Sequence, residues 1–289
     1  MKTRVISGIV GVIILFVIVF SGSFFISAAV FLLSLIGIYE FYNAVSNVGY
    51  KPVRIFGYIS CLPILIVGLN TQNKYFTDYL AIIKSASYIS LGLFLIIIFL
   101  FLIIIFNFEK FNIINISLTV FGMLYVPFLF SFVVLTRRMD HGFYYLWIIF
   151  IGAFATDTCA YFSGRFFGKK KILPVISPKK TLEGSIGGIL GSMILTYAFG
   201  IFLNYKLGKG SADIIPHYHF ILLGAINGII SQVGDWGASA IKRFARVKDY
   251  GHLMPGHGGV LDRFDSILFV APAVYFYIRL IVFDYQLLK

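Results

Sequence analysis

The feature that most constrains this chain is a series of long stretches without a charged side chain. The longest, from Val5 to Tyr39, contains no Asp, Glu, Lys or Arg. A helix of about 20 apolar residues crosses the hydrocarbon core of a bilayer, so this stretch is long enough for two helices, with a break at Ser21–Ser23. Comparable stretches follow along the chain. We predict nine membrane-spanning helices, at residues 5–20, 24–40, 55–69, 85–108, 111–136, 143–162, 184–203, 218–241 and 266–278.

The composition agrees with a membrane protein. Of the 289 residues, 59% are hydrophobic and 12% are charged, whereas about a quarter of the residues in a soluble domain are charged. The net charge is +12, but no soluble segment is long enough for a nucleic-acid-binding domain, so we expect no nucleic-acid partner. We predict an all-α polytopic integral membrane protein. It has about five spans in an N-terminal part, 1–140, and about four in a C-terminal catalytic part, 141–289.

Lysine and arginine set the expected orientation, because cytoplasmic loops of membrane proteins carry an excess of them. With nine spans and a cytoplasmic N-terminus, 16 of the 24 basic residues fall on the cytoplasmic side and 8 on the other. We therefore expect the N-terminus and the loops 164–183 and 240–265 to face the cytoplasm.

Charge is concentrated in two segments, 165–183 and 235–265, which hold 16 of the 36 charged residues. Loops are often charged only because they are solvated. Here both signs are mixed, glycine and proline are interleaved, and two acids, Asp157 and Asp235, fall inside predicted spans. An ionisable residue within a membrane helix is costly and is therefore a candidate functional residue.

The sixth predicted span ends in the sequence DTCAYFSGRFFG. Asp157, Tyr161, Gly164, Arg165 and Gly168 recur on one face of a helix. This face is either a substrate-binding surface or a structural feature. In the structural interpretation the acid and the arginine pair through neighbours, and the two glycines allow close helix packing.

A second motif reads SPKKTLEGSIGG. Ser-Pro favours a turn, Lys179 and Lys180 place two positive charges beside it, and Thr181 is suited to cap the helix that follows. A helix N-terminus with adjacent lysines is a plausible anion site. An ordinary basic loop at the membrane surface is the alternative.

The most informative stretch reads GDWGASAIKRFARVKDYGHLMPGHGGVLDRFDS. Asp235 lies on a polar stripe with Ser231 and Ser239, and the turn Pro255–Gly259 contains three glycines whose N–H groups can converge on a phosphate. If the loop folds back, Asp262 meets Asp235. Two carboxylates in a basic environment suggest Mg²⁺ rather than zinc. Together these features fit metal-assisted phosphoryl or nucleotidyl transfer, although each alone also fits a structural or transport role.

This stretch resembles the CDP-diacylglycerol synthase family, also called phosphatidate cytidylyltransferases. The family pattern has Ser, Lys-Arg, Lys-Asp, a Pro-x-His-Gly-Gly turn and Asp-Arg-x-Asp at fixed spacing. The matching residues are Ser239, Ile241, Lys242, Arg243, Lys248, Asp249, Gly251, Pro255, His257, Gly258, Gly259, Asp262, Arg263 and Asp265. The two upstream motifs resemble family blocks in the expected order. The chain departs from the pattern at Ala238, where many members have Glu.

The resemblance implies an enzyme that transfers the cytidylyl group of CTP to phosphatidic acid, with Mg²⁺ alone or with a second cation. It also implies a homodimer in the inner (plasma) membrane, with the active site facing the cytoplasm. The implied metal ligands are Asp235 and Asp262. The expected catalytic residues are Asp235, Lys242, Arg243, Lys248, Asp249, His257, Asp262, Arg263 and Asp265. The expected substrate-binding residues are Asp157, Tyr161, Arg165, Ser177, Lys179, Lys180, Thr181, Glu183, Ser239, Gly258 and Gly259.

Three other functions stay open at this point. The first is a cytidylyltransferase acting on a different lipid phosphate, because acyl-chain contacts leave no distinctive motif. The second is an ion-coupled membrane transporter that uses Asp157 and Asp235. The third is a catalytically inactive scaffold, which Ala238 favours.

Overall fold

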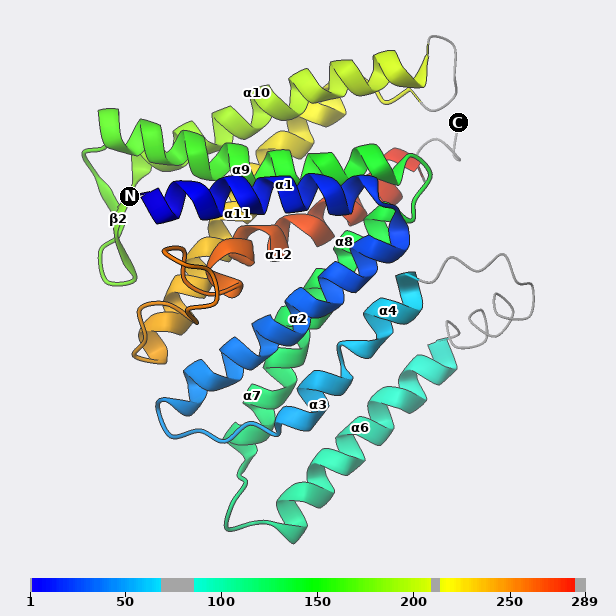
Figure 1. Cartoon of the computed structure of the whole chain (residues 1–289), viewed down its shortest axis with the longest axis vertical. Coiled ribbons are helices and arrows are strands. Elements are labelled where there is room, and N and C mark those ends of the chain that lie inside the picture. The colour runs from blue at the N-terminus through cyan, green and yellow to red at the C-terminus, as the bar shows by residue number, and fades with distance from the viewer. Residues whose placement is uncertain (1, 69–85, 209–213, 284–289) are drawn as a thin grey trace.

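The computed structural model describes residues 2–68, 86–208 and 214–283 (Figure 1). Within these ranges every predicted span overlaps a helix; the segment 69–85, between the third and fourth predicted spans, lies outside the described residues. The helices are α1 (Lys2–Phe20), α2 (Ser23–Ser46), α3 (Arg54–Ile59), α4 (Leu62–Gly68), α6 (Ala86–Phe106), α7 (Ile113–Met123), α8 (Leu129–Arg137), α9 (Gly142–Phe167), α10 (Leu182–Leu207), α11 (His217–Phe244) and α12 (Leu261–Phe276). Two π-helical segments, η1 (Leu124–Phe128) and η2 (Tyr277–Phe283), join α7 to α8 and extend α12.

Five helices in the described ranges are long and apolar enough to cross a membrane. They are Ser23–Ser46, Ile113–Arg137, Gly142–Phe167, Leu182–Leu207 and Leu261–Val282. The helix α11 has 28 residues, but polar side chains such as Asn227 and Gln232 lower its hydropathy. The fold class is therefore a helical membrane protein, as predicted. The count of nine crossings and the side of the N-terminus stay predictions.

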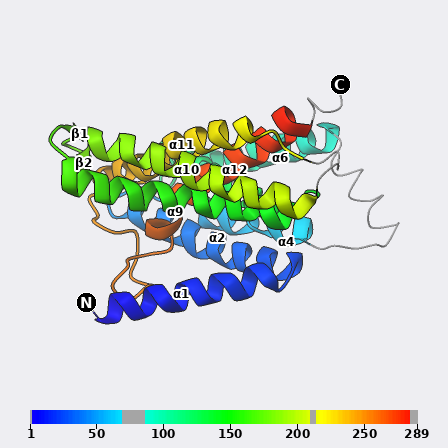
Figure 2. The same cartoon turned by 90° about the horizontal axis from the view of Figure 1, so that it is seen from above.

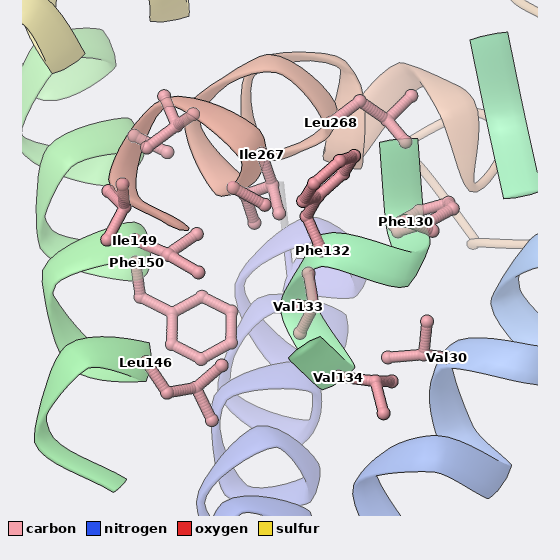
Figure 3. Close-up of a cluster of buried hydrophobic side chains, with 14 of the residues drawn as sticks. Val30, Phe130, Phe132, Val133, Val134, Leu146, Ile149, Phe150, Ile267 and Leu268 are labelled. Carbon is pink, nitrogen blue, oxygen red and sulfur yellow. The ribbon is translucent and has the colours of Figure 1, made fainter. Parts of the chain in front are cut away.

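The core lies where α2, α8, α9 and α12 meet (Figure 3). Phe130, Leu146 and Ile267 are buried there, and the labelled side chains of the four helices point toward one another. Large apolar side chains are also exposed on the outside of the bundle, among them Phe106 and Phe166. In water such a surface would be a liability, so the outward-facing Phe residues are those of a protein solvated by lipid.

A β-hairpin follows α9, and the sequence did not predict it. Strand β1 (Lys171–Leu173) pairs antiparallel with β2 (Ser177–Thr181). At its base, the Leu182 N–H donates to the Lys170 carbonyl at 2.8 Å. The hairpin gives the basic segment a fixed shape, so that Lys179 and Lys180 sit on a strand rather than in an irregular loop.

Small residues set the spacing of α9 and α10. A Cβ atom on Gly184 would lie 3.1 Å from the Cα of Gly164, and one on Gly188 would lie 3.0 Å from the carbonyl oxygen of Thr156. The packing role expected for Gly164 is therefore present, although its partner is Gly184 on the next helix. This close approach brings the hairpin over the end of α9.

The charged connections gather at one end of the bundle (Figures 1 and 2). Arg243 Nε, near the end of α11, donates to the carbonyl of Ile176 in the hairpin turn at 3.2 Å. The connection 245–260 reaches the N-terminal part of α1, where Ser7 Oγ lies 2.8 Å from His257 Nδ1. The hairpin, this connection and the start of α1 therefore lie at the same end of the bundle.

Candidate active site

Three carboxylates from three helices gather beneath the hairpin. Asp157 comes from α9, Asp235 from α11 and Asp265 from α12, and they lie close enough for their charges to interact. Ser266 Oγ is 3.4 and 3.5 Å from the two carboxylate oxygens of Asp157. Lys180 of β2 forms an ion pair with Asp235. The structure therefore brings together two intramembrane acids and a hairpin lysine that the sequence singled out separately.

Lys180 is the positive charge at this acid cluster. Burial alone lowers the pKa of an ammonium group, but the negative charges of Asp235, Asp157 and Asp265, together with the hydrogen bond to Asp235, outweigh that effect and raise the pKa of Lys180 above its usual value. Lys180 is therefore positively charged at neutral pH.

A cavity of about 320 Å³ opens beside the cluster, between α9, the hairpin, α10 and α11. This volume is within the usual range for small-ligand pockets, about 300–1,000 Å³. Six of the expected substrate-binding residues line it: Asp157, Tyr161, Arg165, Lys179, Lys180 and Thr181. Within this wall, Arg165 Nη1 donates to the hydroxyl of Tyr161 at 3.1 Å. The two motifs around α9 and the hairpin thus form one surface with cationic groups.

Local hydrogen bonds hold the strand of lysines in place. Thr181 caps α10 by accepting a hydrogen bond from the Gly184 N–H at 3.2 Å, as predicted. The Glu183 carboxylate accepts hydrogen bonds from the N–H groups of Lys169 at 3.0 Å and Lys170 at 3.3 Å. Ser177 begins β2 and pairs with β1. Thr181, Glu183 and Ser177 therefore position the two lysines.

The glycine-rich turn forms a second polar surface. Gly256 and Gly258 have φ angles of 75° and 83°, which residues with a side chain rarely adopt. Arg263 Nε donates to the His257 carbonyl at 2.7 Å. A cavity of about 510 Å³ lies here, lined by Lys248, Asp249, His252, Met254, Gly256, His257, Gly258 and Arg263. The expected turn is present, with two cations and two histidines around an open space.

Asp262 lies at the start of α12, where its carboxylate is fully engaged by protein donors. Its Oδ1 accepts from Lys242 Nζ at 2.8 Å. Its Oδ2 accepts from the N–H groups of Tyr250 at 2.8 Å and Gly259 at 3.0 Å. Lys242 and Asp262 are both largely buried, with side chains 15% and 4% exposed. In this arrangement the pair holds the connection 245–260 against α11 and α12.

Comparison with known proteins matches almost the whole chain. A model of the cytidylyltransferase family matches residues 2–281. The chain belongs to the cytidylyltransferase family. It is 32% identical to a phosphatidate cytidylyltransferase of Staphylococcus haemolyticus over 272 residues, covering 94% of this chain and 96% of the relative. It is 29% identical to that of Bacillus subtilis over 281 residues, 97% and 98% of the two chains. For Staphylococcus aureus strain COL the identity is 32% over 274 residues, 94% and 96%. The resemblance inferred from the motifs is confirmed.

In this cytidylyltransferase-family chain, Glu40 on α2 is a site residue that the sequence reasoning missed. Its carboxylate is buried and accepts hydrogen bonds from the N–H groups of Val260 and Leu261, both at 2.9 Å. A Cβ atom on Gly251 would lie 2.5 Å from Glu40 Oε1, so the chain passes close to the acid. The signal was present: Glu40 is an acid within a predicted span, 24–40, as Asp157 and Asp235 are within theirs.

Among the other residues that line the cavity of about 320 Å³ are three with polar side-chain groups: Ser185, Gln232 and Trp236. Ser185 and Gln232 are joined by a hydrogen bond between their side chains, and Gln232 Nε2 also donates to the Gly228 carbonyl at 2.8 Å. Trp236 Nε1 is buried without a hydrogen-bond partner among the described residues. Uncharged polar residues in a helix have no sequence signal as strong as an acid, and so these were not predicted.

Ala238, the departure from the family pattern, lies on the buried face of α11. It is fully buried, and its carbonyl accepts a hydrogen bond from the hydroxyl of Tyr250 at 3.1 Å. Burial raises the pKa of Tyr250, which keeps the phenol protonated as the donor. Ser239, the next residue, is half-buried. At position 238 this chain has packing and a backbone contact in place of the carboxylate that many members carry.

The acid cluster fits a hard divalent cation by its chemistry. Carboxylate oxygens are the ligands that Mg²⁺ prefers, and three of them converge around Asp235. In the part of the chain that the structure describes, no group of three or more His, Cys, Asp and Glu side chains is already spaced to hold a metal ion. The chemistry of the donors therefore suits Mg²⁺, while their spacing in the described residues is not that of a formed metal site.

Proposed function

We propose that this protein transfers the cytidylyl group of CTP to phosphatidic acid, giving CDP-diacylglycerol and pyrophosphate. The full-length similarity to bacterial phosphatidate cytidylyltransferases carries this proposal. Two cavities with cationic walls support it, one lined by Asp157, Arg165, Lys179 and Lys180 and the other by Lys248 and Arg263. Each of the two substrates carries phosphate.

The reaction requires neutralisation of negative charge more than it requires a general base. An oxygen of the phosphatidate phosphate attacks the α-phosphorus of CTP, a new P–O bond forms, and the bond to the β-phosphate breaks to release pyrophosphate. The attacking phosphate is already anionic at neutral pH. The main obstacle is the repulsion between two anions, so positioning and fixed positive charge supply most of the catalysis.

The residues divide into those open to substrate and those that hold the site together. Arg165, Lys179 and Lys180 face the first cavity and are suited to the triphosphate. Lys248, His257 and Arg263 face the second, with Gly258 and Gly259 in the turn and Asp249 at its rim. Lys242 and Arg243 were expected to bind phosphate. Their present contacts, to Asp262 and to the Ile176 carbonyl, favour a positioning role for both.

Mg²⁺ is part of the proposal, held by Asp235 with Asp157 and Asp265 as the nearest further carboxylates. When bound, it would neutralise phosphate charge during the transfer. Asp262, the other expected ligand, becomes available only if Lys242 and two backbone N–H groups release it. Asp235 is therefore the first metal ligand to test.

We also propose the membrane arrangement expected from the sequence. The chain crosses the inner (plasma) membrane nine times with a cytoplasmic N-terminus, and two copies form a homodimer. The hairpin, the connection 245–260 and the start of α1 share one side, which supports a site that faces the cytoplasm, where CTP is found. Single cysteines introduced into these segments and labelled from either side of the membrane test the orientation.

The test of the reaction uses purified protein, labelled CTP and phosphatidate, with Mg²⁺ or with EDTA. We expect a lipid-soluble labelled product only when Mg²⁺ and phosphatidate are both present. Product from another lipid phosphate but not from phosphatidate would indicate a different lipid substrate. Absence of product across a panel of lipid phosphates, from folded protein, would reject the enzyme and leave the transporter and scaffold.

A further inference from the structure

The polar cavity at the glycine-rich turn continues into the membrane part of the protein. Met254, His257 and Arg263 line both this cavity and a second one, of about 470 Å³. That second cavity in turn shares Gly11 and Phe264, among others, with a third of about 330 Å³. Because they share these lining residues, the three cavities adjoin one another from the turn into the core, and we call them together the α1 groove.

The lining of the α1 groove changes along its length. At the turn it presents Lys248, His257 and Arg263. At the far end the walls are apolar and come from α1, α2, α8, α9 and α12. Figure 3 shows the inner wall of this end, where Val133 and Phe150 lie among other labelled side chains of the core. A molecule that fits this groove has an anionic head and an apolar tail.

Helix α1 forms the outer wall of the groove. It is the outermost helix on its face of the bundle (Figure 2), and Ile9, Ile13 and Val17 are exposed on its far side. At the polar end it is attached to the turn, because Ser7 Oγ contacts His257 Nδ1 and donates to the Pro255 carbonyl at 3.1 Å. The outer wall of the groove is therefore fastened at the end where the cations lie.

The length of the groove matches a hydrocarbon chain. The residues of α1 that line it run from Ser7 to Val19, a rise of about 18 Å at 1.5 Å per residue. One half of the hydrocarbon core of a bilayer is about 15 Å thick. A chain lying along α1 would therefore reach from the charged end of the bundle to about the middle of the membrane.

We propose that the α1 groove holds an acyl chain of phosphatidate, with the phosphate of the same lipid at Arg263 and His257. This inference rests on the proposed function and specifies where its lipid substrate binds. It commits to the substrate lipid, because the cationic end of the groove is also a wall of the candidate active site. A structural lipid of another class is the alternative that the test must separate.

Gly11 offers a direct way to fill the groove. It lines the two deeper cavities, and a Cβ atom placed on it would meet no atom within 4 Å. The variant Gly11→Trp therefore starts from a Cβ atom that has room and adds an indole at the wall of the groove. Ile13→Trp, on the exposed side of the same helix, is the matched control.

The first measurement is equilibrium binding of labelled dioleoyl phosphatidate to the purified protein without CTP, which does not depend on turnover. We expect Gly11→Trp to weaken binding by about tenfold or more, because losing a few methylene contacts is enough for that. Ile13→Trp should stay within about twofold of the unchanged protein. Unchanged binding in Gly11→Trp would overturn the proposal. So would equal competition by dioleoyl phosphatidylcholine, which would indicate a structural lipid.

The second measurement is turnover with dioleoyl and with dihexanoyl phosphatidate. Gly11→Trp should raise KM much more for the long-chain lipid than for the short-chain lipid, because far more of the long chain lies in and beyond the blocked part of the groove. An equal loss with both lipids would mean that the substitution damages the site itself, and would overturn the proposal. If the unchanged protein turned over neither lipid, the proposed function would fail, while the binding measurement would still decide the groove.

Discussion

Glu40 on α2 accepts a hydrogen bond from the N–H of Leu261, 221 residues further along the chain, at 2.9 Å. The N–H of Val260 binds the other oxygen of the same carboxylate at the same distance. An acid at this point satisfies two of the unpaired N–H groups at the start of α12 and complements the positive end of its dipole. Asp262, Arg263 and Asp265 follow within the next turn of α12, so the bonds to Glu40 fix the position of the helix turn that carries them.

Glu40→Gln tests this positioning role. The amide oxygen of Gln can accept only one of the two bonds, and its NH₂ group faces a donor. We expect kcat to fall by about tenfold, the usual effect of losing a hydrogen bond to a charged group, with KM for CTP little changed. Trypsin should also cleave faster at Arg246 and Lys248, which lie exposed in the connection.

The control is Tyr39→Phe, on the exposed neighbour of Glu40, which should leave both kcat and cleavage unchanged. If Glu40→Gln slowed turnover without changing the rate of cleavage, the acid would act on the reaction by some route other than positioning the connection.

Lys242→Met distinguishes two roles for Asp262. If Asp262 mainly holds the connection, losing either partner of this buried pair costs stability, about 3–5 kcal/mol. Lys242→Met and Asp262→Asn should then lower Tm similarly and share the same Mg²⁺ requirement. A raised Mg²⁺ requirement in Asp262→Asn alone would instead support the expected metal ligation by Asp262. Both are measured by thermal unfolding and by Mg²⁺ titration of activity.

Asp235→Asn should raise the Mg²⁺ concentration needed for half-maximal activity by about tenfold or more, since one hard anionic ligand is lost. The protein should remain folded, because Asn still fits beside Lys180. Mn²⁺ binding, followed by electron paramagnetic resonance, gives a readout that is independent of turnover. Unchanged Mn²⁺ affinity in this variant would remove Asp235 from the metal site.

The ion pair of Lys180 and Asp235 gives a pH dependence with a definite sign. The pKa of Lys180 is raised in the folded protein, so the pair contributes stability below the pKa of an unfolded lysine, about 10.4. That contribution is lost as the pH rises through the folded pKa. In thermal unfolding from pH 7 to 11, the Tm of the unchanged protein should fall above about pH 10. The Lys180→Met variant should lack this fall in Tm. A parallel fall in both proteins would mean that other groups cause it.

Gly258→Ala tests the geometry of the turn. At a φ of 83° a side chain costs about 1–2 kcal/mol, and the added Cβ would lie 2.8 Å from Asp262 Oδ2. Gly49→Ala carries the same kind of backbone cost at φ 92° with no neighbour within 4 Å. We expect both to lower Tm and only Gly258→Ala to reduce kcat/KM. Equal effects on activity would mean that the turn is not part of the site.

Much of the fold follows from the distribution of charge along the chain. Every predicted span overlaps a helix, because a bilayer requires apolar runs of a length that the sequence makes plain. The ends of the helices were predicted less accurately. Helix α9 continues to Phe167 and α12 begins at Leu261, because charged residues at a helix end resemble those of a loop. The hairpin was not predicted because neither the Ser-Pro pair nor the neighbouring lysines indicate that two strands pair.

Residues of the site were predictable when they were charged and belonged to a recognisable motif. Asp157, Asp235 and Lys180 were found and lie together. Glu40 was overlooked because it is the last residue of the predicted span 24–40 and belongs to no recognised motif. Whether Gln232 and Trp236 line the cavity depends on which face of α11 packs against α10. Tertiary packing sets this rotation of α11, and the residue pattern along one helix does not predict it.

The bond from Glu40 to the start of α12 also bears on how the polypeptide is made. The ribosome synthesises α2 long before α12, so Glu40 is in place when α12 forms. The start of α12 therefore packs against a helix that was made early in synthesis. A fragment containing only residues 141–289 would carry the whole acid cluster, yet it would lack the carboxylate that closes the beginning of α12.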